Sequence, residues 1–154
     1  MSLYGLLVLA HIVAAMIWVG GGIVALATAR RVESSAEPAA KRAFAAIDAW
    51  TGARVFGPAA FSVVLFGILM VWQSEAWSFG QLWVWLSLTL AVASLVLGGA
   101  FFGPESGRIA RLASERGPDD IEVARRRARM ALLQNVDLAA ILVIVALMVF
   151  KPGA

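Results

Sequence analysis

Four long stretches of this chain carry almost only apolar residues, and the charged residues collect between them. The apolar stretches run approximately over residues 3–29, 53–72, 82–102 and 131–150. A helix needs about 20 predominantly apolar residues to cross a hydrocarbon core of about 30 Å. Because lipid offers the backbone no hydrogen-bond partners, unbroken stretches of this length must be helical. The pattern therefore predicts four transmembrane helices.

The helical pattern continues beyond the last apolar stretch. The segment Pro118-Asp119-Asp120 is typical of a helix start, because proline fits the first turn and carboxylates there favour the helix dipole. A helix over 119–150 would be about 48 Å long and would extend past the membrane into water. A short helix after Pro38 is expected to end before Gly57-Pro58. We predict one all-α domain over residues 1–154, a four-helix transmembrane bundle with helices extended into the cytoplasm, at about 3–29, 53–72, 82–102 and 119–150.

Composition agrees with a membrane protein. Of the 154 residues, 61% are hydrophobic, and the mean hydropathy is +0.83. This composition excludes an ordinary soluble domain. The chain contains no cysteine, so disulfides, thiolate ligands and cysteine redox chemistry are excluded as well.

Basic residues are distributed very unevenly over the connections between the predicted helices. Twelve of the thirteen lysine and arginine residues lie in or beside the first and third connections, and the short second connection, residues 73–81, has none. The positive-inside rule therefore places both long loops in the cytoplasm and both termini outside. We expect a multi-pass protein of the bacterial inner membrane. Acidic residues alternate with the arginines, which favours a surface that contacts lipid headgroups over a nucleic-acid site.

A single histidine, His11, lies well inside the first apolar stretch. Ionisable residues at bilayer depth are costly, so they need a partner and are candidates for a functional site. For the glycine run Gly20–Gly22 on the same helix, we favour close helix packing over clearance for a ligand. Residues at helical spacing from the histidine share its face: Tyr4, Ala14, Ala15 and Trp18.

A second polar group, Asp137, lies on the fourth predicted helix. Arg54 stands at the cytoplasmic entrance of the second helix and is the most plausible ion-pair partner. We favour this structural ion pair over a proton relay, because a relay uses a chain of titratable groups.

Two short motifs carry a resemblance to a known superfamily. The segments Leu9-Ala10-His11-Ile12 and Ile17-Trp18-Val19-Gly20-Gly21 resemble the first-helix signature of small four-helix membrane proteins. That superfamily includes the copper-resistance D membrane domain, the HemJ-type protoporphyrinogen oxidase and a group described only as predicted integral membrane proteins. The final segment, Met148–Gly153, is similar to the end of this last group, which the chain resembles most.

The resemblance implies a haem site. In HemJ-type members the first-helix histidine is an axial ligand of haem b, which implies that role for His11 and a redox or electron-transfer function. The lysine that those members carry near the start of helix three is missing from residues 81–86, so porphyrinogen oxidation is not implied. An imidazole within a helical bundle is also a common haem ligand. The sixth ligand could be Met16, Met70, water or His11 of a second copy in a symmetric dimer, or the position could be open.

Two alternatives use the same residues. Copper binding or transport would use the imidazole of His11 with the thioethers of Met16 and Met70, which suit cuprous ion. A cofactor-free accessory or scaffold subunit of a larger membrane assembly would use His11 only as a hydrogen-bonding contact between helices. A transporter is less favoured, because we find no internal duplication or broken helix in the sequence.

Overall fold

The computed structural model describes residues 2–35 and 37–153, which form four long helices connected by short loops. All four helices are long and apolar enough to cross a membrane, and the described residues contain no strand. The first three helices each contain one turn of π-helix. Their segments are α1 (Leu3–Ala15), η1 (Met16–Gly20) and α2 (Gly21–Glu33); α3 (Pro38–Thr51), η2 (Gly52–Phe56) and α4 (Gly57–Gln73); α5 (Leu82–Leu97), η3 (Gly98–Phe102) and α6 (Gly103–Glu115); and α7 (Ile121–Phe150).

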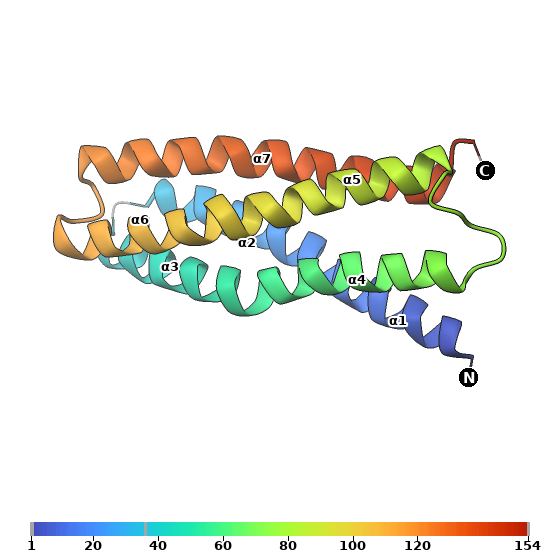
Figure 1. Ribbon diagram of the computed structural model, residues 1–154. Helices are drawn as coiled ribbons and strands as arrows, with labels where there is room; N and C mark the ends of the chain where they lie inside the picture. The colour runs from blue at the N-terminus through green and yellow to red at the C-terminus, as the bar shows by residue number, and fades with distance from the viewer. Residues whose placement is uncertain (1, 36, 154) are drawn as a thin grey trace.

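The helices run alternately up and down in one elongated bundle (Figure 1). The α2–α3 and α6–α7 connections lie at one end of the bundle, which we call the basic end because it carries Arg30, Lys41, Arg116 and Arg127. Both ends of the chain and the α4–α5 connection lie at the opposite end. The predicted all-helical class with four candidate membrane spans is confirmed.

Local hydrogen bonds explain where the first and last helices begin and end. The Ser2 hydroxyl accepts a hydrogen bond from the Gly5 N–H at 3.1 Å, as expected of an N-cap. The Asp120 carboxylate accepts one from the Glu122 N–H at 2.9 Å, so α7 begins at Ile121, two residues after the predicted start. Lys151 adopts a left-handed conformation, with φ of 44°, and ends this helix.

The second and third helices are longer than predicted, because Gly57-Pro58 and Gly103-Pro104 do not end them. In each case the glycine N–H donates to a carbonyl five residues earlier, that of Gly52 or Gly98. Proline has no N–H and its ring clashes with the carbonyl four residues before it in a regular α-helix. The wider π turn before each proline accommodates this defect. The helix after Pro38 therefore continues into α4 instead of ending before Gly57.

Two apolar clusters hold the bundle together, one toward each end. The cluster at the basic end contains Ala113 and Val123, both fully buried, together with Met130. The other cluster includes Ile144. Asp137 lies seven residues from both Met130 and Ile144, on the same face of α7 and between the two clusters.

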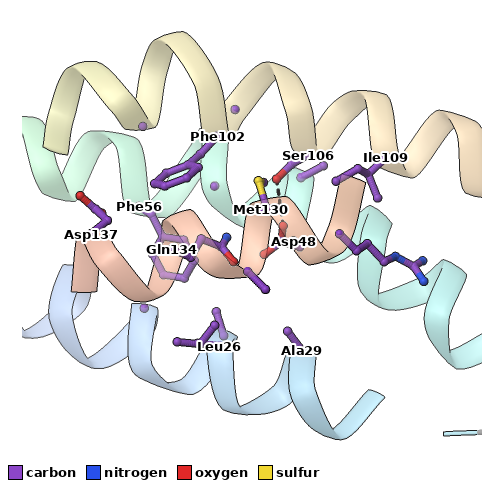
Figure 2. A pocket seen from close by; sticks show the side chains of 18 of the residues that line it. Leu26, Ala29, Asp48, Phe56, Phe102, Ser106, Ile109, Met130, Gln134 and Asp137 are labelled. Carbon is purple, nitrogen blue, oxygen red and sulfur yellow. Dashed lines mark hydrogen bonds between the residues drawn. The ribbon is translucent and has the colours of Figure 1, made fainter. Parts of the chain in front are cut away.

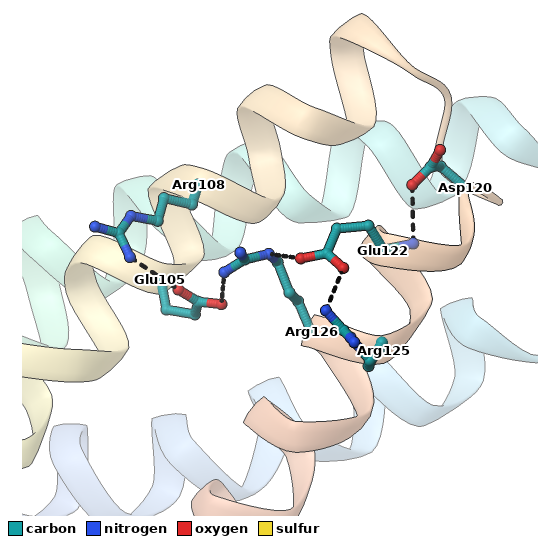
Figure 3. A network of polar contacts seen from close by, with 6 residues as sticks. All are labelled: Glu105, Arg108, Asp120, Glu122, Arg125 and Arg126. Atoms are coloured by element: carbon teal, nitrogen blue, oxygen red, sulfur yellow. Dashed lines mark hydrogen bonds and ion pairs between the residues drawn. The ribbon is translucent and has the colours of Figure 1, made fainter.

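Ion pairs connect α6 to α7 at the basic end (Figure 3). Arg126 lies 2.7 Å from Glu105 on α6 and 2.7 Å from Glu122 on its own helix. Glu105 is 7% exposed, so its negative charge is largely buried and depends on this guanidinium. The network fixes the position of α7 relative to α6 where both helices leave the apolar part of the bundle.

The glycines of the run Gly20–Gly22 have different surroundings. A Cβ on Gly21 would collide with the ring of Phe56, so this glycine permits a close contact between the first two helices. A Cβ on Gly20 or Gly22 would meet no atom within 4 Å. The predicted close packing is therefore confirmed for Gly21, and the prediction is wrong for its two neighbours.

We predict opposite effects for alanine at two neighbouring glycines. Gly21→Ala should lower the free energy of unfolding by about 1–3 kcal/mol, because the Phe56 ring must move. Gly22→Ala should leave it unchanged or raise it by up to about 1 kcal/mol, because alanine has the higher helix propensity and open space receives its methyl group. Reversible unfolding in mixed micelles measures both values. Equal losses for the two variants would contradict the Gly21–Phe56 contact.

Candidate functional site

A cavity of about 600 Å³ lies between the four long helices, in the half of the bundle toward the basic end. Most of its lining is apolar, with a few polar side chains from α3, α5, α6 and α7. Toward the basic end its lining reaches Arg30 and Glu33, which are exposed. Figure 2 shows side chains from opposite helices pointing into this space.

Glycines leave the cavity open. Gly22, Gly52, Gly98 and Gly99 all line it, and a Cβ on any of them would meet no atom within 4 Å. Small residues in membrane helices usually allow two backbones to approach closely. At these four glycines, no neighbouring helix approaches the position that a Cβ would occupy. At Gly22, Gly52 and Gly98, which are half-buried, the missing side chain therefore leaves space instead of a helix contact, whereas Gly99 is exposed.

A repeated pattern of residues builds two neighbouring walls of the cavity. In both cases a polar residue is followed at intervals of four by glycine and phenylalanine, and the phenylalanine directly precedes Gly-Pro. One copy is Asp48, Gly52, Phe56, Gly57 and Pro58, and the other, 46 residues later, is Ser94, Gly98, Phe102, Gly103 and Pro104.

The two copies lie on helices that run in opposite directions. Our expectation that the chain has no internal duplication missed this pattern, because the residues between the shared positions differ. The signal that could have revealed it is the recurrence of Phe-Gly-Pro at the same distance from a glycine inside two apolar stretches.

Two serine–aspartate pairs line the cavity at different levels along the bundle. The Ser94 hydroxyl of α5 donates a hydrogen bond to Asp137 Oδ1 of α7. The Ser106 hydroxyl of α6 donates one to Asp48 Oδ2 of α3 at 3.0 Å. All four residues line the cavity. Ser94 and Ser106 are twelve residues apart, which separates the two pairs by about 18 Å along the bundle.

The basic side chains of the lining have partners at the basic end. Arg127 lies 3.3 Å from Glu33, and Lys41 lies 2.7 Å from Asp119. Arg30 donates a hydrogen bond to the Asn135 side-chain oxygen at 2.6 Å. The three basic side chains that line the cavity therefore already have hydrogen-bonding or ion-pair partners near its rim, the part of the lining toward the basic end.

The expected ion pair between Arg54 and Asp137 is not formed. Arg54 lies in the π turn η2 on the exposed side of its helix, with its guanidinium 5.7 Å from the centre of the Trp50 ring. Asp137 faces α5 and is hydrogen-bonded to Ser94. The prediction was wrong because both residues were assigned to the same level of the bundle without knowledge of the face that each presents.

His11 lies at the contact between α1 and α4 and is 8% exposed. Its Nδ1 is 3.0 Å from the carbonyl oxygen of Val63, so the neutral ring donates this hydrogen bond. The ring occupies the space beside Gly67, where a Cβ would stand 3.4 Å from His11 Cε1. His11 is not among the residues that line the cavity.

The other residues predicted around His11 are only partly brought together. Ala14 is buried and Ala15 is half-buried, whereas Tyr4 is 36% exposed. Trp18 alone of this group lines the cavity.

The two predicted thioether ligands lie in different surroundings. Met16 is 68% exposed on the outside of the bundle, and Met70 is half-buried. In the described part of the chain, no three His, Cys, Asp or Glu side chains come together as a metal site.

Comparison with known proteins identifies a family. Residues 5–152 match the family described as "Predicted integral membrane protein (DUF2269)". The comparisons with curated proteins and with solved structures found no match. Because the match extends over nearly the whole chain and agrees with the four apolar helices, the chain belongs to this family of predicted integral membrane proteins.

Proposed function

We propose that this protein binds a small, largely apolar molecule in the cavity between its four helices. The observation that carries the proposal is the set of four glycines whose missing side chains face open space. Ligand sites in proteins are typically concave, mostly apolar and about 300–1,000 Å³ in volume, with a few polar groups that orient the ligand. The cavity, with its apolar walls and two serine–aspartate pairs, has these properties.

We infer that the basic end lies in the cytoplasm and that both termini lie outside, in the inner membrane of a bacterium. The two connections at the basic end, with the adjoining ends of the helices, carry twelve of the thirteen lysine and arginine residues. A ligand would then enter from the cytoplasm or from the inner leaflet, past Arg30 and Glu33.

Haem b binding with His11 as axial ligand is the second candidate. Its support is the hydrogen bond from Nδ1 to the Val63 carbonyl, because metal-binding histidines usually donate one ring N–H in this way and keep the other nitrogen free for the metal. Haem would supply one-electron redox chemistry. The cavity does not fit this role, since His11 does not line it. A haem on His11 would need a site outside the cavity, for instance between two copies of the chain.

Copper binding and a scaffold role have less specific support. Met16 is exposed and His11 is buried, so these two donors lie on different sides of the first long helix. The His11–Val63 hydrogen bond is also the contact that a cofactor-free subunit would need, and it joins α1 to α4 without any ligand. A homodimer or a larger assembly is compatible with each of these functions.

The orientation is tested with enzyme fusions to the C-terminus. Alkaline phosphatase, which is active only outside the cytoplasm, should be active when it follows residue 154. β-Galactosidase at the same position should be inactive. The reverse result would place the basic end outside.

Cavity binding is tested with N-phenyl-1-naphthylamine, a neutral apolar dye, added to the protein in lipid nanodiscs. We expect saturable fluorescence in excess of that in empty nanodiscs. Gly98→Leu, which fills the cavity, should reduce this binding at least about tenfold, because an occupied cavity cannot accommodate the dye.

Gly20→Leu is the matched control for this experiment. A Cβ on Gly20 would also meet no atom within 4 Å. Gly20, however, is exposed on the outside of the bundle and does not line the cavity. Dye binding should remain at the wild-type level in this variant. The same dye affinity in wild type, Gly98→Leu and Gly20→Leu would reject the cavity as a binding site.

The haem candidate is tested by the visible spectrum of protein purified in mild detergent from cells supplied with a haem precursor. A Soret band that shifts on reduction with dithionite and is lost in His11→Ala would support it. His11→Gln controls for folding, because its amide can still donate to the Val63 carbonyl. A spectrum without a Soret band, or a band unchanged in both variants, would reject His11-ligated haem.

A further inference from the structure

Three acidic side chains line the cavity, and two of them, Asp48 and Asp137, have no basic partner among the described residues. Among the described residues, Asp48 and Asp137 each accept a hydrogen bond from one serine, and neither forms an ion pair. A carboxylate away from bulk water is costly unless a positive charge or several hydrogen bonds compensate it. One serine hydroxyl supplies only part of that compensation, so each carboxylate retains the capacity to accept from a further donor.

The basic residues of the lining do not supply the missing charge. Lys41 and Arg127 are already in ion pairs with Asp119 and Glu33 near the basic end. Arg30 donates to Asn135 there. The interior of the cavity therefore combines two carboxylates with no positive side chain deeper than its rim.

Aromatic rings lie between the two carboxylates. Phe102 follows Ser94 by eight residues and Phe56 follows Asp48 by eight residues on a helix of the opposite direction, so both rings stand between the two serine–aspartate levels. Figure 2 shows Phe56 and Phe102 in this position, between Asp137 and Asp48. The faces of aromatic rings carry partial negative charge and attract cations.

From this arrangement we propose that the cavity selects an organic cation with an apolar or aromatic body, whose charge is held by Asp48 or Asp137 and whose body lies against Phe56 and Phe102. The proposal rests on the proposed function and adds the chemical class of the ligand. A neutral ligand would leave both carboxylates uncompensated, and an anion would be repelled by them. A metal ion alone does not fit as well, since its charge needs several ligands at short range and the cavity is about 600 Å³ in volume.

Two ions of nearly the same shape and opposite charge test this proposal. Tetraphenylphosphonium is the cation and tetraphenylborate the anion, and equilibrium dialysis compares protein-containing nanodiscs with empty ones to subtract partition into lipid. We expect wild-type protein to bind the cation saturably, and the anion at least about tenfold more weakly. Equal affinity for the two ions, or tighter binding of the anion, would overturn the proposal.

Asparagine variants of the two acids identify the groups that hold the charge. Asp137→Asn and Asp48→Asn keep a side chain that can accept from serine but remove the negative charge. At least one of them should weaken binding of the cation about tenfold or more, because a charged hydrogen-bonding partner is lost. Glu75→Gln is the matched control, since Glu75 is exposed in the α4–α5 connection at the other end of the bundle and should leave binding unchanged. Unchanged cation affinity in both asparagine variants would reject the proposal.

The neutral dye separates this proposal from the proposed function. If the asparagine variants and wild type bind N-phenyl-1-naphthylamine equally, the cavity is intact. Any loss of cation binding is then caused by removal of the negative charge. If the dye binds but the protein does not prefer the cation to the anion, the cavity is a binding site and the proposed class of ligand is wrong. If Gly98→Leu changes neither dye nor cation binding, both proposals fail.

Discussion

Backbone hydrogen bonding inside the membrane is the constraint on which the rest of this structure depends. Lipid cannot satisfy a free carbonyl, so a helix that contains proline must satisfy its own backbone or break. In this protein Pro58 and Pro104 are preceded by a π turn in which a glycine N–H bonds to a carbonyl five residues earlier. The helices therefore continue through both prolines. Since the glycine at the start of each turn faces open space, the same feature that preserves the helices also forms the walls of the cavity.

The cavity can persist because the helices are held together on both sides of it. At the basic end, an apolar cluster around Val123 and the ion pairs of Arg126 join α6 to α7. Toward the termini, a second cluster packs around Ile144. The Ser94–Asp137 hydrogen bond adds a polar contact between α5 and α7, and the Ser106–Asp48 hydrogen bond adds one between α6 and α3. The bundle is thus held together at both ends and open between its helices in the half toward the basic end, which is the arrangement that a ligand site between helices requires.

His11 and the cavity are two separate features of the molecule. The imidazole satisfies its Nδ1 at the α1–α4 contact through the Val63 carbonyl, and Gly67 provides the space that the ring occupies. Among the described residues, the carboxylates of Asp48 and Asp137 each accept a side-chain hydrogen bond from one serine, and neither forms an ion pair. Uncompensated charge inside a membrane protein is the stronger indication of a ligand, because a satisfied polar group requires nothing further.

The sequence by itself determined the four apolar helices, the uneven distribution of basic residues and the helix start beside Asp120, because length, charge and capping depend on neighbours along the chain. It indicated His11 and Asp137 as polar residues that need partners, but not which partners. The partner of Asp137 is Ser94 instead of Arg54. In the run Gly20–Gly22, a Cβ would collide with a neighbouring helix at Gly21 but not at Gly20 or Gly22. Only the tertiary structure decided these points. Which face a helical residue presents depends on how π turns rotate the segments that follow them, and whether a glycine fills or opens a space depends on the helix opposite.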